Sequence, residues 1–552
     1  MTDTPTSYTH PLQELRAQVS AAAGAVRGAH GELPVPPRIE RPKREGQGDY
    51  STNAAMLLAP VLGAAPRVIA ERLADELSGR LGDDLDSAEV AGPGFLNLTL
   101  SSGWHQKALG SVLAAGAAYG SGGAQPSERI LIEFVSANPT GPLVAASGRH
   151  AAYGDALARI LAHHGHDVSR EYYFNDAGNQ IRLLGESVRA RARGEEVPEG
   201  GYQGQYVREL AEQIPGAGDR DPEELAAQAV EILLAKIKAT LERYGVRYDD
   251  FFSERALHEG SPSGVERGLE LLEQAGHTYR SDGAVWLRTT AFGDDKDRVV
   301  VRSSGEPTYL AADIAYLQNK RERGFERQLL PVGADHHAYA RELKAAMAAL
   351  GGDPDTVEVP ILQFVHLVEG SERAAFSKRK GSFVTLDDLL DEIGVDATRF
   401  FMLQRSHDRT VDLDLDLARR QSAENPVYYV QYAHARIATM LARLPAARVE
   451  AAVADRDGWE AEQLHPSERK LINKLAALPD EIAEAVERRA PHRIAVYALE
   501  LAQEFTAFYR DCRVVGVTPE PLESFRIALS VAAQRTIALS LGLLGVSAPD
   551  SM

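Results

Sequence analysis

The chain has 552 residues, 44% of them hydrophobic and 25% charged, a balance typical of folded soluble proteins that excludes disordered and fibrous classes. Its 60 lysines and arginines against 79 aspartates and glutamates give a net charge of −19, which argues against indiscriminate nucleic-acid coating but permits docking of one folded RNA. The single cysteine, Cys512, excludes an intramolecular disulfide and a cysteine-rich zinc site.

The length predicts three or four domains, at roughly 100 to 200 residues each. Apolar runs stay shorter than the roughly 18 to 20 residues that a bilayer requires. Residues 1–5 are polar and show no basic region followed by an apolar stretch, so no secretory signal is expected. We therefore expect a cytoplasmic protein without a membrane partner.

The first part of the chain predicts a small α+β domain, placed at residues 1–110. Helical periodicity runs from Pro66 to Leu77. Residues 95–100 then alternate between Leu96, Leu98 and Leu100 on one side and more polar residues on the other, as in a half-buried strand. A stretch rich in Gly, Ala and Ser at residues 117–127 is a plausible linker.

From residue 129 the pattern becomes that of a βαβ unit, which is typical of the opening of a nucleotide-binding parallel sheet. We therefore expect a Rossmann-like catalytic domain at 111–414, interrupted by an insertion of polar and helical character at about 182–276. The unit consists of a strand over Ile130–Val135, a helix over Ser147–His163 and a strand over Val168–Phe174, and later strands are expected at 284–288, 298–302 and 328–332.

After about residue 415 strand signals almost vanish and amphipathic helices continue to the end of the sequence. One apolar stripe at helical spacing includes Ile494, Tyr497, Leu501, Phe505 and Phe508. We expect an all-α helical bundle at 415–552. The predicted fold class is thus multidomain α/β, with a Rossmann-like parallel sheet between an N-terminal α+β domain and a C-terminal helical bundle.

The crossing from the first strand to its helix, residues 133–150, is where open α/β sheets bind ligands. Small residues such as Ala145, Ala146 and Gly148 permit close approach, and the helix start offers N–H groups to phosphate. Ser147 is a candidate helix cap or phosphate ligand. By composition alone, an ordinary tight loop before a capped helix explains the same residues.

A basic segment follows at Ser377, Lys378, Arg379 and Lys380, before a helix expected at 386–393. Lysines on a glycine-flanked loop can close over a triphosphate and neutralise the pyrophosphate that forms. The alternative is a solvated basic loop.

A third group combines Tyr309 with Asp313, which are spaced to share one helix face. An aromatic ring and a carboxylate suit a guanidinium, although a surface helix with a salt-bridged Asp is the alternative. Gly333, Asp335 and His336 follow a predicted strand and suit contacts to a base or ribose. The adjacent His336 and His337 lack a third ligand at a known spacing, so no structural metal is expected.

Taken together, these segments resemble the arginyl-tRNA synthetases of class I along nearly the whole chain. The resemblance implies ATP-dependent activation of L-arginine to arginyl-adenylate, with Mg²⁺ accompanying ATP, and transfer to the 3′-terminal adenosine of arginine tRNA. Members of this family are often monomers, so a monomer is expected. The supporting strings are Gly48–Ala55, Gly92–Phe95, Tyr172–Gln180, Asn425–Arg436 and Gly542–Pro549.

The resemblance also assigns roles to individual residues of this chain. Arginine is expected to contact Glu133, Asn138, Tyr309, Asp313 and His337. ATP is expected to contact Pro142, Val144, Ala146, Ser147, Arg149, Gly333, Asp335, His336 and Lys378. Ser377, Lys378, Arg379 and Lys380 are the expected catalytic residues, and Asn53, Tyr432, His434 and Arg436 the expected tRNA contacts.

Two departures from the family pattern leave alternatives open. Val144–Ser147 stands where class I enzymes carry His-x-Gly-His, and Ala375 stands where the Lys-Met-Ser-Lys-Ser loop begins with lysine. Loss of a transition-state donor costs about 10²-fold or more in rate. Either other residues compensate, with Ser147, Arg149, His150, Lys378 and Lys380 as candidates, or the chain is a non-catalytic tRNA-binding or regulatory protein.

Two further readings stay open. A dinucleotide enzyme would need Gly-x-Gly-x-x-Gly at the crossing, which carries a different sequence. A synthetase for another amino acid would keep its activity with arginine after replacement of Asp313 by alanine.

Overall fold

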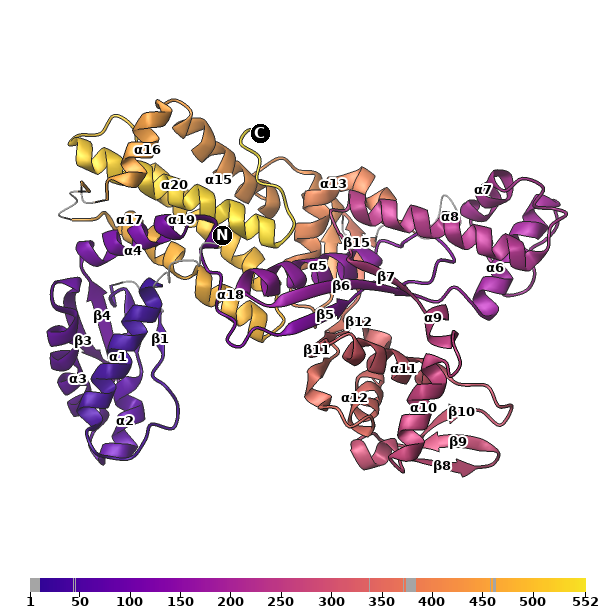
Figure 1. Cartoon of the computed structure of the whole chain (residues 1–552). Coiled ribbons are helices and arrows are strands. Elements are labelled where there is room, and N and C mark those ends of the chain that lie inside the picture. Colours follow the sequence, from indigo (N-terminus) through magenta and orange to yellow (C-terminus); the bar gives the residue numbers. More distant parts are fainter. Residues whose placement is uncertain are drawn as a thin grey trace, which may run out of the picture.

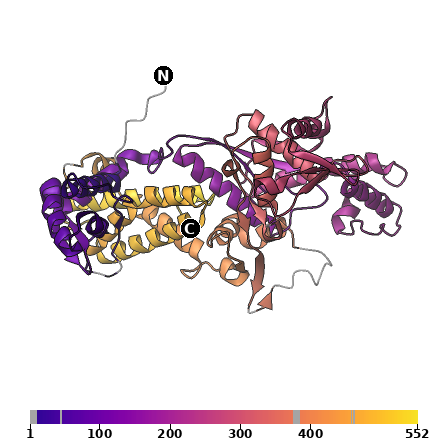
Figure 2. The same ribbon diagram turned by 90° about the horizontal axis from the view of Figure 1, so that it is seen from below.

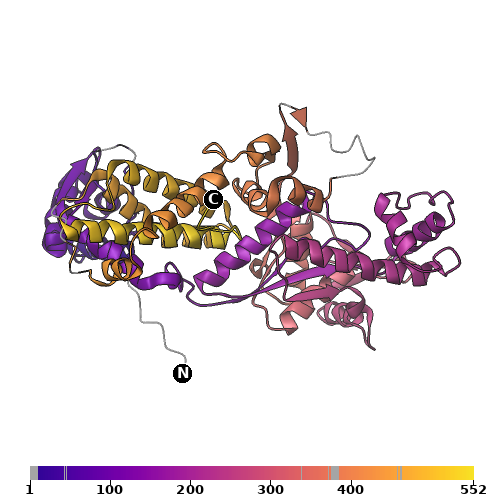
Figure 3. The same cartoon turned by 90° about the horizontal axis from the view of Figure 1, so that it is seen from above.

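The computed structural model describes residues 10–42, 44, 46–336, 338–370, 372–373, 384–456, 458–459 and 463–552. The C-terminal helices lie between the N-terminal lobe and the catalytic sheet, and helices α6 (Asn179–Ala192), α7 (Gln205–Gln213) and α8 (Pro222–Arg243) project at the far end (Figure 1). The views from below and above show the same order of lobes (Figure 2, Figure 3). The expected multidomain α/β fold is confirmed.

The N-terminal lobe packs helices against an antiparallel sheet of order β1-β2-β4-β3. Leu96, Leu98 and Leu100 on β4 are all 0% exposed, which confirms the predicted half-buried strand. The helix predicted from Pro66 continues to Leu81, where Gly82 ends it with a positive φ of 52°. The elements are α1 (Pro11–Arg27), β1 (Ile39–Glu40), β2 (Tyr50–Thr52), α2 (Ala54–Leu62), α3 (Pro66–Leu81), β3 (Leu85–Ala91), β4 (Phe95–Leu100) and α4 (Ser102–Ala115).

The catalytic region is organised by a five-stranded sheet of order β13-β11-β5-β6-β7, in which every pairing is parallel. Helix α5 (Ser147–His164) joins β5 to β6 and begins and ends within a residue of its predicted bounds. A Cβ at Gly154 would lie 2.2 Å from Phe134, so glycine allows α5 to lie directly against the end of β5. The strands are β5 (Arg129–Glu133), β6 (Asp167–Phe174), β7 (Asp250–Ser253), β11 (Arg327–Leu329) and β13 (Val357–Glu358).

The stretch 182–276 contains more than helices, because β7 lies within it and forms one edge of the parallel sheet. The strands expected near 284 and 298 are present as β9 and β10, but together with β8 they form a separate antiparallel sheet of order β10-β9-β8. This part contains α9 (Arg255–His258), α10 (Gly264–Gln274), β8 (Thr278–Ser281), β9 (Ala284–Leu287), β10 (Arg298–Val301), α11 (Tyr309–Glu322) and α12 (Tyr339–Ala349).

Between the sheet and the C-terminal bundle, β12 (Val332–Gly333) pairs with β14 (Ile361–Leu362), and β15 (Val365–Glu369) lies between β16 (Glu372–Arg373) and β17 (Val411–Asp414). Helix α13 (Leu386–Leu403) bends at Gly394, whose φ of 79° and ψ of 168° are not helical. Helix α14 (Leu415–Arg419) follows, and single-turn 3-10 helices are η1 (Gly82–Asp84), η2 (Gly116–Ala118), η3 (Thr289–Phe292), η4 (Ala334–His336) and η5 (Pro354–Thr356).

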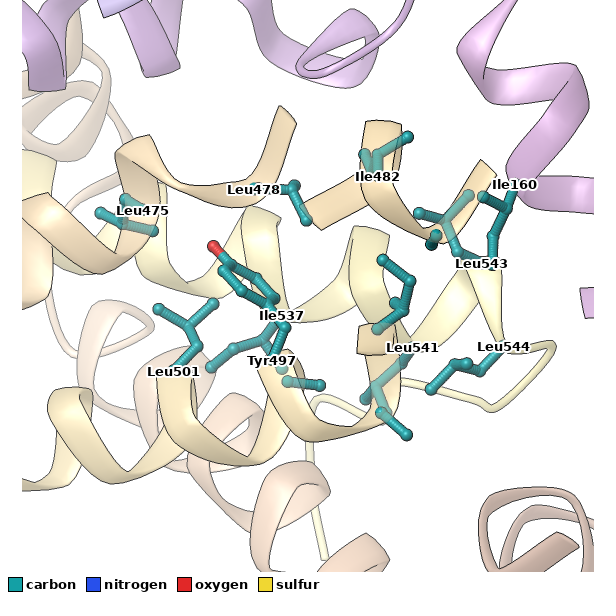
Figure 4. Packing of buried hydrophobic residues seen from close by; sticks show 14 of the residues in the cluster. Ile160, Leu475, Leu478, Ile482, Tyr497, Leu501, Ile537, Leu541, Leu543 and Leu544 are labelled. Carbon is teal, nitrogen blue, oxygen red and sulfur yellow. The ribbon is translucent and has the colours of Figure 1, made fainter. Parts of the chain in front are cut away.

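The C-terminal bundle is all-α, as predicted. Ile494, Tyr497, Leu501, Phe505 and Phe508 of the predicted stripe are each at most 1% exposed. Figure 4 shows Tyr497 and Leu501 packed with residues of the last helix. The helices are α15 (Pro426–Leu441), α16 (Ala446–Ala454), α17 (Pro466–Ala476), α18 (Leu478–Glu487), α19 (His492–Asp511) and α20 (Glu520–Leu543).

Helix lengths and composition also bear on membrane crossing. Among the residues that the structure describes, no single helix is long and apolar enough to span a bilayer. Helix α2 and the segment Pro66–Asp84 would together be long and apolar enough, but the chain bends by 119° between them.

Candidate functional site

A cluster of acidic side chains, Glu133, Glu254 and Asp313, gathers where β5, β6 and β7 end, the position at which parallel sheets bind ligands; this cluster is called the acidic pocket below. Glu133 is the last residue of β5, Tyr173 belongs to β6 and Glu254 directly follows β7. Helices α11 and α12 supply Asp313 and Tyr339. The parallel order of the strands therefore brings together residues that are far apart in the sequence.

Glu133 is held from two sides. Its Oε1 accepts a hydrogen bond from Ser136 Oγ at 3.0 Å, and its Oε2 lies 2.6 Å from Lys320 Nζ. The chain turns sharply after Glu133, with positive φ values of 69° at Val135 and 44° at Ser136. A β-branched residue rarely adopts such a backbone, and strain of this kind gathers at functional sites. Here the turn brings the Ser136 hydroxyl back onto Glu133.

Asp313 faces the same pocket from α11. Its Oδ1 accepts a hydrogen bond from Tyr339 Oη at 3.1 Å. Burial raises the pKa of Asp313 to about 7, the negative charges of Glu133 and Glu254 add to the rise, and Tyr339 and Lys320 oppose it. A carboxyl with this pKa is part-protonated at neutral pH and becomes fully ionised when a cation binds beside it.

Glu254 completes the carboxylates of the pocket. Its Oε2 accepts a hydrogen bond from Tyr173 Oη at 2.7 Å. The ring of Tyr316 lies 4.7 Å from Tyr173 and 4.7 Å from Phe252, measured between centroids, so aromatic rings line the base of the pocket. Carboxylates above aromatic rings suit a planar guanidinium, which stacks and binds carboxylates through two N–H groups.

The other residues predicted to bind arginine are placed differently. Tyr309 and Asp313 lie on α11 at the predicted spacing, but Tyr309 is 76% exposed. The hydroxyl beside Asp313 is that of Tyr339, so Tyr309 does not enclose the pocket in this conformation. Asn138 is exposed and donates from Nδ2 to Gln180 Oε1 at 2.9 Å. His337 lies outside the described residues.

Sequence reasoning missed four residues of the pocket: Glu254, Tyr173, Tyr339 and Lys320. The signal for Glu254 was its position after an apolar pair, Phe251 and Phe252, in a strand that was hidden within the predicted insertion. The pairing of Lys320 with Glu133 spans 187 residues, which no local pattern reveals.

The start of α5 is where the sequence predicts contacts to a nucleotide. Ala145 N donates to Val384 O at 2.9 Å, and Leu386 N donates to Leu143 O at 2.8 Å. These bonds join the segment before α5 to the segment before α13. A Cβ at Gly148 would lie 2.9 Å from Leu386 Cδ1, which confirms that the small residue permits close approach.

The predicted cap of α5 lies within the described residues, whereas the basic segment does not. Ala146, and not Ser147, is the N-cap; Ser147 is the first residue of the helix, so its expected capping role is corrected. Ser147 is half-buried, and the N–H groups of Ser147, Gly148 and Arg149 donate to the carbonyl oxygens of the residues three positions before them at 2.9 to 3.1 Å. The basic segment with Ser377, Lys378, Arg379 and Lys380 lies outside the described residues, as does Ala375, but its following residue Val384 is bonded to Ala145.

Arg149 is not positioned to bind ATP, which corrects its predicted role. The residue is 2% exposed, and its guanidinium donates to the carbonyl oxygens of Gln363 at 2.5 Å, Ser406 at 2.9 Å and Arg409 at 2.7 Å. Burial lowers the pKa of Arg149 to about 10. Arg149 therefore joins α5 to two loops and has no donor directed at a phosphate.

The remaining residues predicted to bind ATP lie on two segments. Gly333 belongs to β12, and Asp335 and His336 belong to η4 directly after it. The ring of His336 lies 6.2 Å from that of Tyr339, which places it next to the acidic pocket. Pro142 and Val144 are half-buried and Ala146 is exposed, in the segment that leads into α5.

The predicted tRNA contacts fall on two other surfaces. Asn53 lines a pocket of about 610 Å³ in the N-terminal lobe, together with Arg38 and Phe95. In the helical bundle, the guanidinium of Arg436 lies 5.3 Å from the ring of Tyr432 and 5.0 Å from that of Tyr509. These residues line a pocket of about 300 Å³.

His434 is corrected as a candidate RNA contact. It is 5% exposed, and its Nδ1 lies 2.9 Å from the carbonyl oxygen of Pro549. The residue thus holds the last residues of the chain against α15 and presents little surface to an RNA.

Comparison with known proteins gives matches along the chain. Residues 13–100 match "Arginyl tRNA synthetase N terminal domain", residues 218–438 match "tRNA synthetases class I (R), catalytic domain", and residues 430–552 match "DALR anticodon binding domain". The arginine–tRNA ligase of Frankia alni is 45% identical over 557 residues, covering 98% of this chain and all of that protein.

Solved structures agree. A putative arginyl-tRNA synthetase from Campylobacter jejuni has 33% identity and a TM-score of 0.74, and the match covers 81% of this chain and 99% of that one. The arginyl-tRNA synthetase of Thermus thermophilus has 25% identity and a TM-score of 0.75, over 98% of this chain and 100% of that one.

Proposed function

The chain belongs to the arginyl-tRNA synthetases and is an arginine–tRNA ligase that uses ATP, and from this premise we propose which residues bind each substrate. The acidic pocket of Glu133, Glu254 and Asp313 binds the guanidinium of L-arginine. The observation that carries this proposal is the convergence of carboxylates from β5, β7 and α11 on one aromatic-based pocket. Asn138, at the rim, orients the amino-acid end toward the nucleotide.

The start of α5 and the basic segment bind ATP. The positive end of a helix dipole stabilises a phosphate group. Backbone bonds join residues 143–145, which lead into α5, to residues 384–386. Lys378 and Lys380 then neutralise the pyrophosphate that leaves when the arginine carboxylate attacks the α-phosphate. A hydroxyl of the terminal adenosine of tRNA attacks the adenylate in the second step.

Mg²⁺ enters with ATP as part of the substrate. Among the described residues, no group of three or more His, Cys, Asp and Glu side chains is arranged to hold a metal ion. We therefore assign Mg²⁺ to the triphosphate, whose charge it screens, and derive no step from a protein-bound metal.

Arginine tRNA contacts the N-terminal lobe at Asn53 and the bundle at Tyr432 and Arg436. Exposed tyrosines beside an arginine suit stacking with unpaired bases. We place the domains at 1–110, 111–414 with an insertion at about 182–276, and 415–552; the matched family regions, 13–100, 218–438 and 430–552, follow in the same order. The active form is a monomer in the cytoplasm, where its substrates are used in protein synthesis.

The altered signature at Val144–Ser147 favours one second candidate, a tRNA-binding protein without catalysis. Arginine-dependent exchange between ATP and pyrophosphate, with and without arginine tRNA, separates the two. Exchange that needs arginine supports the ligase; retained tRNA binding with no exchange under either condition contradicts it. Lys378→Ala serves as the catalytic control in the same assay.

A further inference from the structure

Lys320 lies beside the acidic pocket, and no step of the proposed function uses it. Its side chain is 0% exposed, and Nζ lies 2.6 Å from Glu133 Oε2 and 3.8 Å from the ring centroid of Tyr316. Burial of an ammonium group is unfavourable unless the group is paired. The pairing with Glu133 and the ring of Tyr316 meets this condition within the pocket itself.

The position of Lys320 follows from the periodicity of α11. Asp313, Tyr316 and Lys320 are spaced three and seven residues apart, so they share one helix face. This face meets the ends of the strands, because Tyr316 is hydrogen-bonded to Glu171 of β6 and Lys320 to Glu133 of β5. The helix that supplies one carboxylate of the pocket therefore also supplies the cation that holds another.

The charges around the pocket show what this cation does. Glu133 and Glu254 raise the pKa of Asp313 in addition to burial, and the positive charge of Lys320 lowers it. The titratable and charged groups on the surrounding elements include Glu133 on β5, Glu171 and Tyr173 on β6, Glu254 after β7, Tyr316 on α11, Arg323 at the end of α11, and Tyr339 on α12. Two histidines also lie here: His258 of α9, whose Nε2 lies 3.6 Å from Glu254 Oε1, and His336 of η4, whose ring lies beside Tyr339. Lys320 therefore opposes the neighbouring negative charges that raise the pKa of Asp313.

We propose that Lys320 is a positioning residue for arginine, an internal counter-cation that fixes Glu133 and offsets part of the negative charge of the pocket into which the guanidinium binds. Lys320 acts through Glu133 and Asp313 and does not touch the substrate. The proposal rests on the assignment of the acidic pocket to arginine. It differs from a purely structural ion pair, because a structural pair sets stability and not the pH range over which arginine binds.

The test measures binding of radiolabelled arginine to the full chain by equilibrium dialysis between pH 6 and pH 9, with arginine tRNA present. Wild type, Lys320→Met, Lys320→Arg and Asp313→Asn are compared. Binding by wild type that is lost in Asp313→Asn establishes the pocket independently of Lys320. Absence of binding by wild type contradicts the assignment of the pocket, and the role of Lys320 with it.

Lys320→Met keeps an unbranched chain over Tyr316 but removes the charge. Loss of a nearby cation raises the pKa of a carboxyl group, and one unit corresponds to about tenfold in the fraction ionised at low pH. We expect arginine binding at pH 7 to weaken about tenfold and its pH midpoint to move to higher pH, while ATP binding is unchanged. Lys320→Arg keeps the charge and recovers most of the affinity.

Two outcomes overturn the proposal. In the first, Lys320→Met lowers the melting temperature but leaves the arginine dissociation constant and its pH midpoint within about twofold of wild type. If Lys320→Met fails to fold, a second experiment replaces it. Lys320→Ala is then assayed with ethylammonium or with ethanol, and recovery of arginine binding by the cation alone supports the proposal, whereas equal recovery or none overturns it.

Discussion

At the ends of β5 and β7 the site is lined by ionisable side chains, whereas at the start of α5 it is lined by backbone groups and small residues. The acidic pocket depends on Glu133, Glu254 and Asp313, each placed by a different element. The nucleotide side depends on the helix start and on backbone bonds such as Ala145 N to Val384 O. In the proposed function, side chains therefore select the amino acid, while backbone groups bind the phosphates of ATP.

This difference explains why the altered signature and the retained pocket can coexist. The dipole of α5 and its backbone do not depend on side chains, so Val144 and Ser147 in the place of histidines leave both unchanged. A carboxylate that faces a guanidinium has no backbone substitute. Substitutions in the two regions should consequently affect different kinetic constants.

Among these substitutions, Asp313→Asn should weaken arginine binding most. It removes a charged hydrogen-bond acceptor from a largely buried site, which we expect to weaken arginine binding by about 10²-fold or more. Equilibrium dialysis with arginine measures the effect, and ATP binding should not change. Glu322→Gln, an exposed change on the same helix, is the matched control. Undiminished arginine binding by Asp313→Asn would show that the pocket is wrongly assigned.

Lys378→Ala should affect the nucleotide side alone. Removal of a group that stabilises developing charge costs about 10²-fold in rate. The rate of arginine-dependent ATP–pyrophosphate exchange should fall by this order, and the arginine dissociation constant should stay at its wild-type value. Lys107→Ala, whose lysine is 70% exposed in the N-terminal lobe, is the control. A change in arginine affinity in place of the exchange rate would contradict the division between the two sides.

Arg436→Ala tests whether the distant bundle acts on tRNA without altering either side of the catalytic site. The guanidinium lies between the rings of Tyr432 and Tyr509, and loss of one base-stacking contact costs about 1–3 kcal/mol. We expect the KM for arginine tRNA in aminoacylation to rise about tenfold, with exchange at saturating tRNA unaffected. Arg510→Ala, an exposed change on α19, should leave the KM for tRNA unchanged.

Lowering the pH should give the smallest change in arginine affinity, and it should leave ATP affinity unaffected. Because burial and the neighbouring carboxylates raise the pKa of Asp313 to about 7, its carboxyl is neutral below pH 7 and ionised above it. Arginine affinity should fall as the pH drops below 7, by at most about tenfold per unit, and level off above 8. Asp313→Asn should remove this dependence. ATP affinity over the same range provides the internal comparison.

Much of the fold could be predicted because its signals are local. The bounds of α5 and β6 follow from periodicity over many residues, and alternation in 95–100 reported the buried face of β4. Strand β7 has four residues in a polar, helix-rich stretch, so periodicity could not separate it from its surroundings. Missing β7 also meant missing Glu254 directly after it.

The site was harder to predict because its contacts are long-range. Spacing placed Tyr309 and Asp313 on one helix, but it could not show that Tyr309 is exposed and that Tyr339 reaches Asp313. Arg149 has the chemistry of a phosphate ligand in the sequence. Only packing of residues 363–364 and 406–409 around it reveals that its donors are already used.

Citrulline offers the most direct test of the central claim, that carboxylates of the acidic pocket recognise the charge of arginine. It has nearly the shape of arginine, but its ureido group is neutral. Competition against radiolabelled arginine at pH 8, with tRNA present, compares the two ligands on the same protein. We predict that citrulline competes at least about 10²-fold more weakly, because two or more carboxylates lose their cation. Competition by citrulline and unlabelled arginine at similar concentrations would contradict the account.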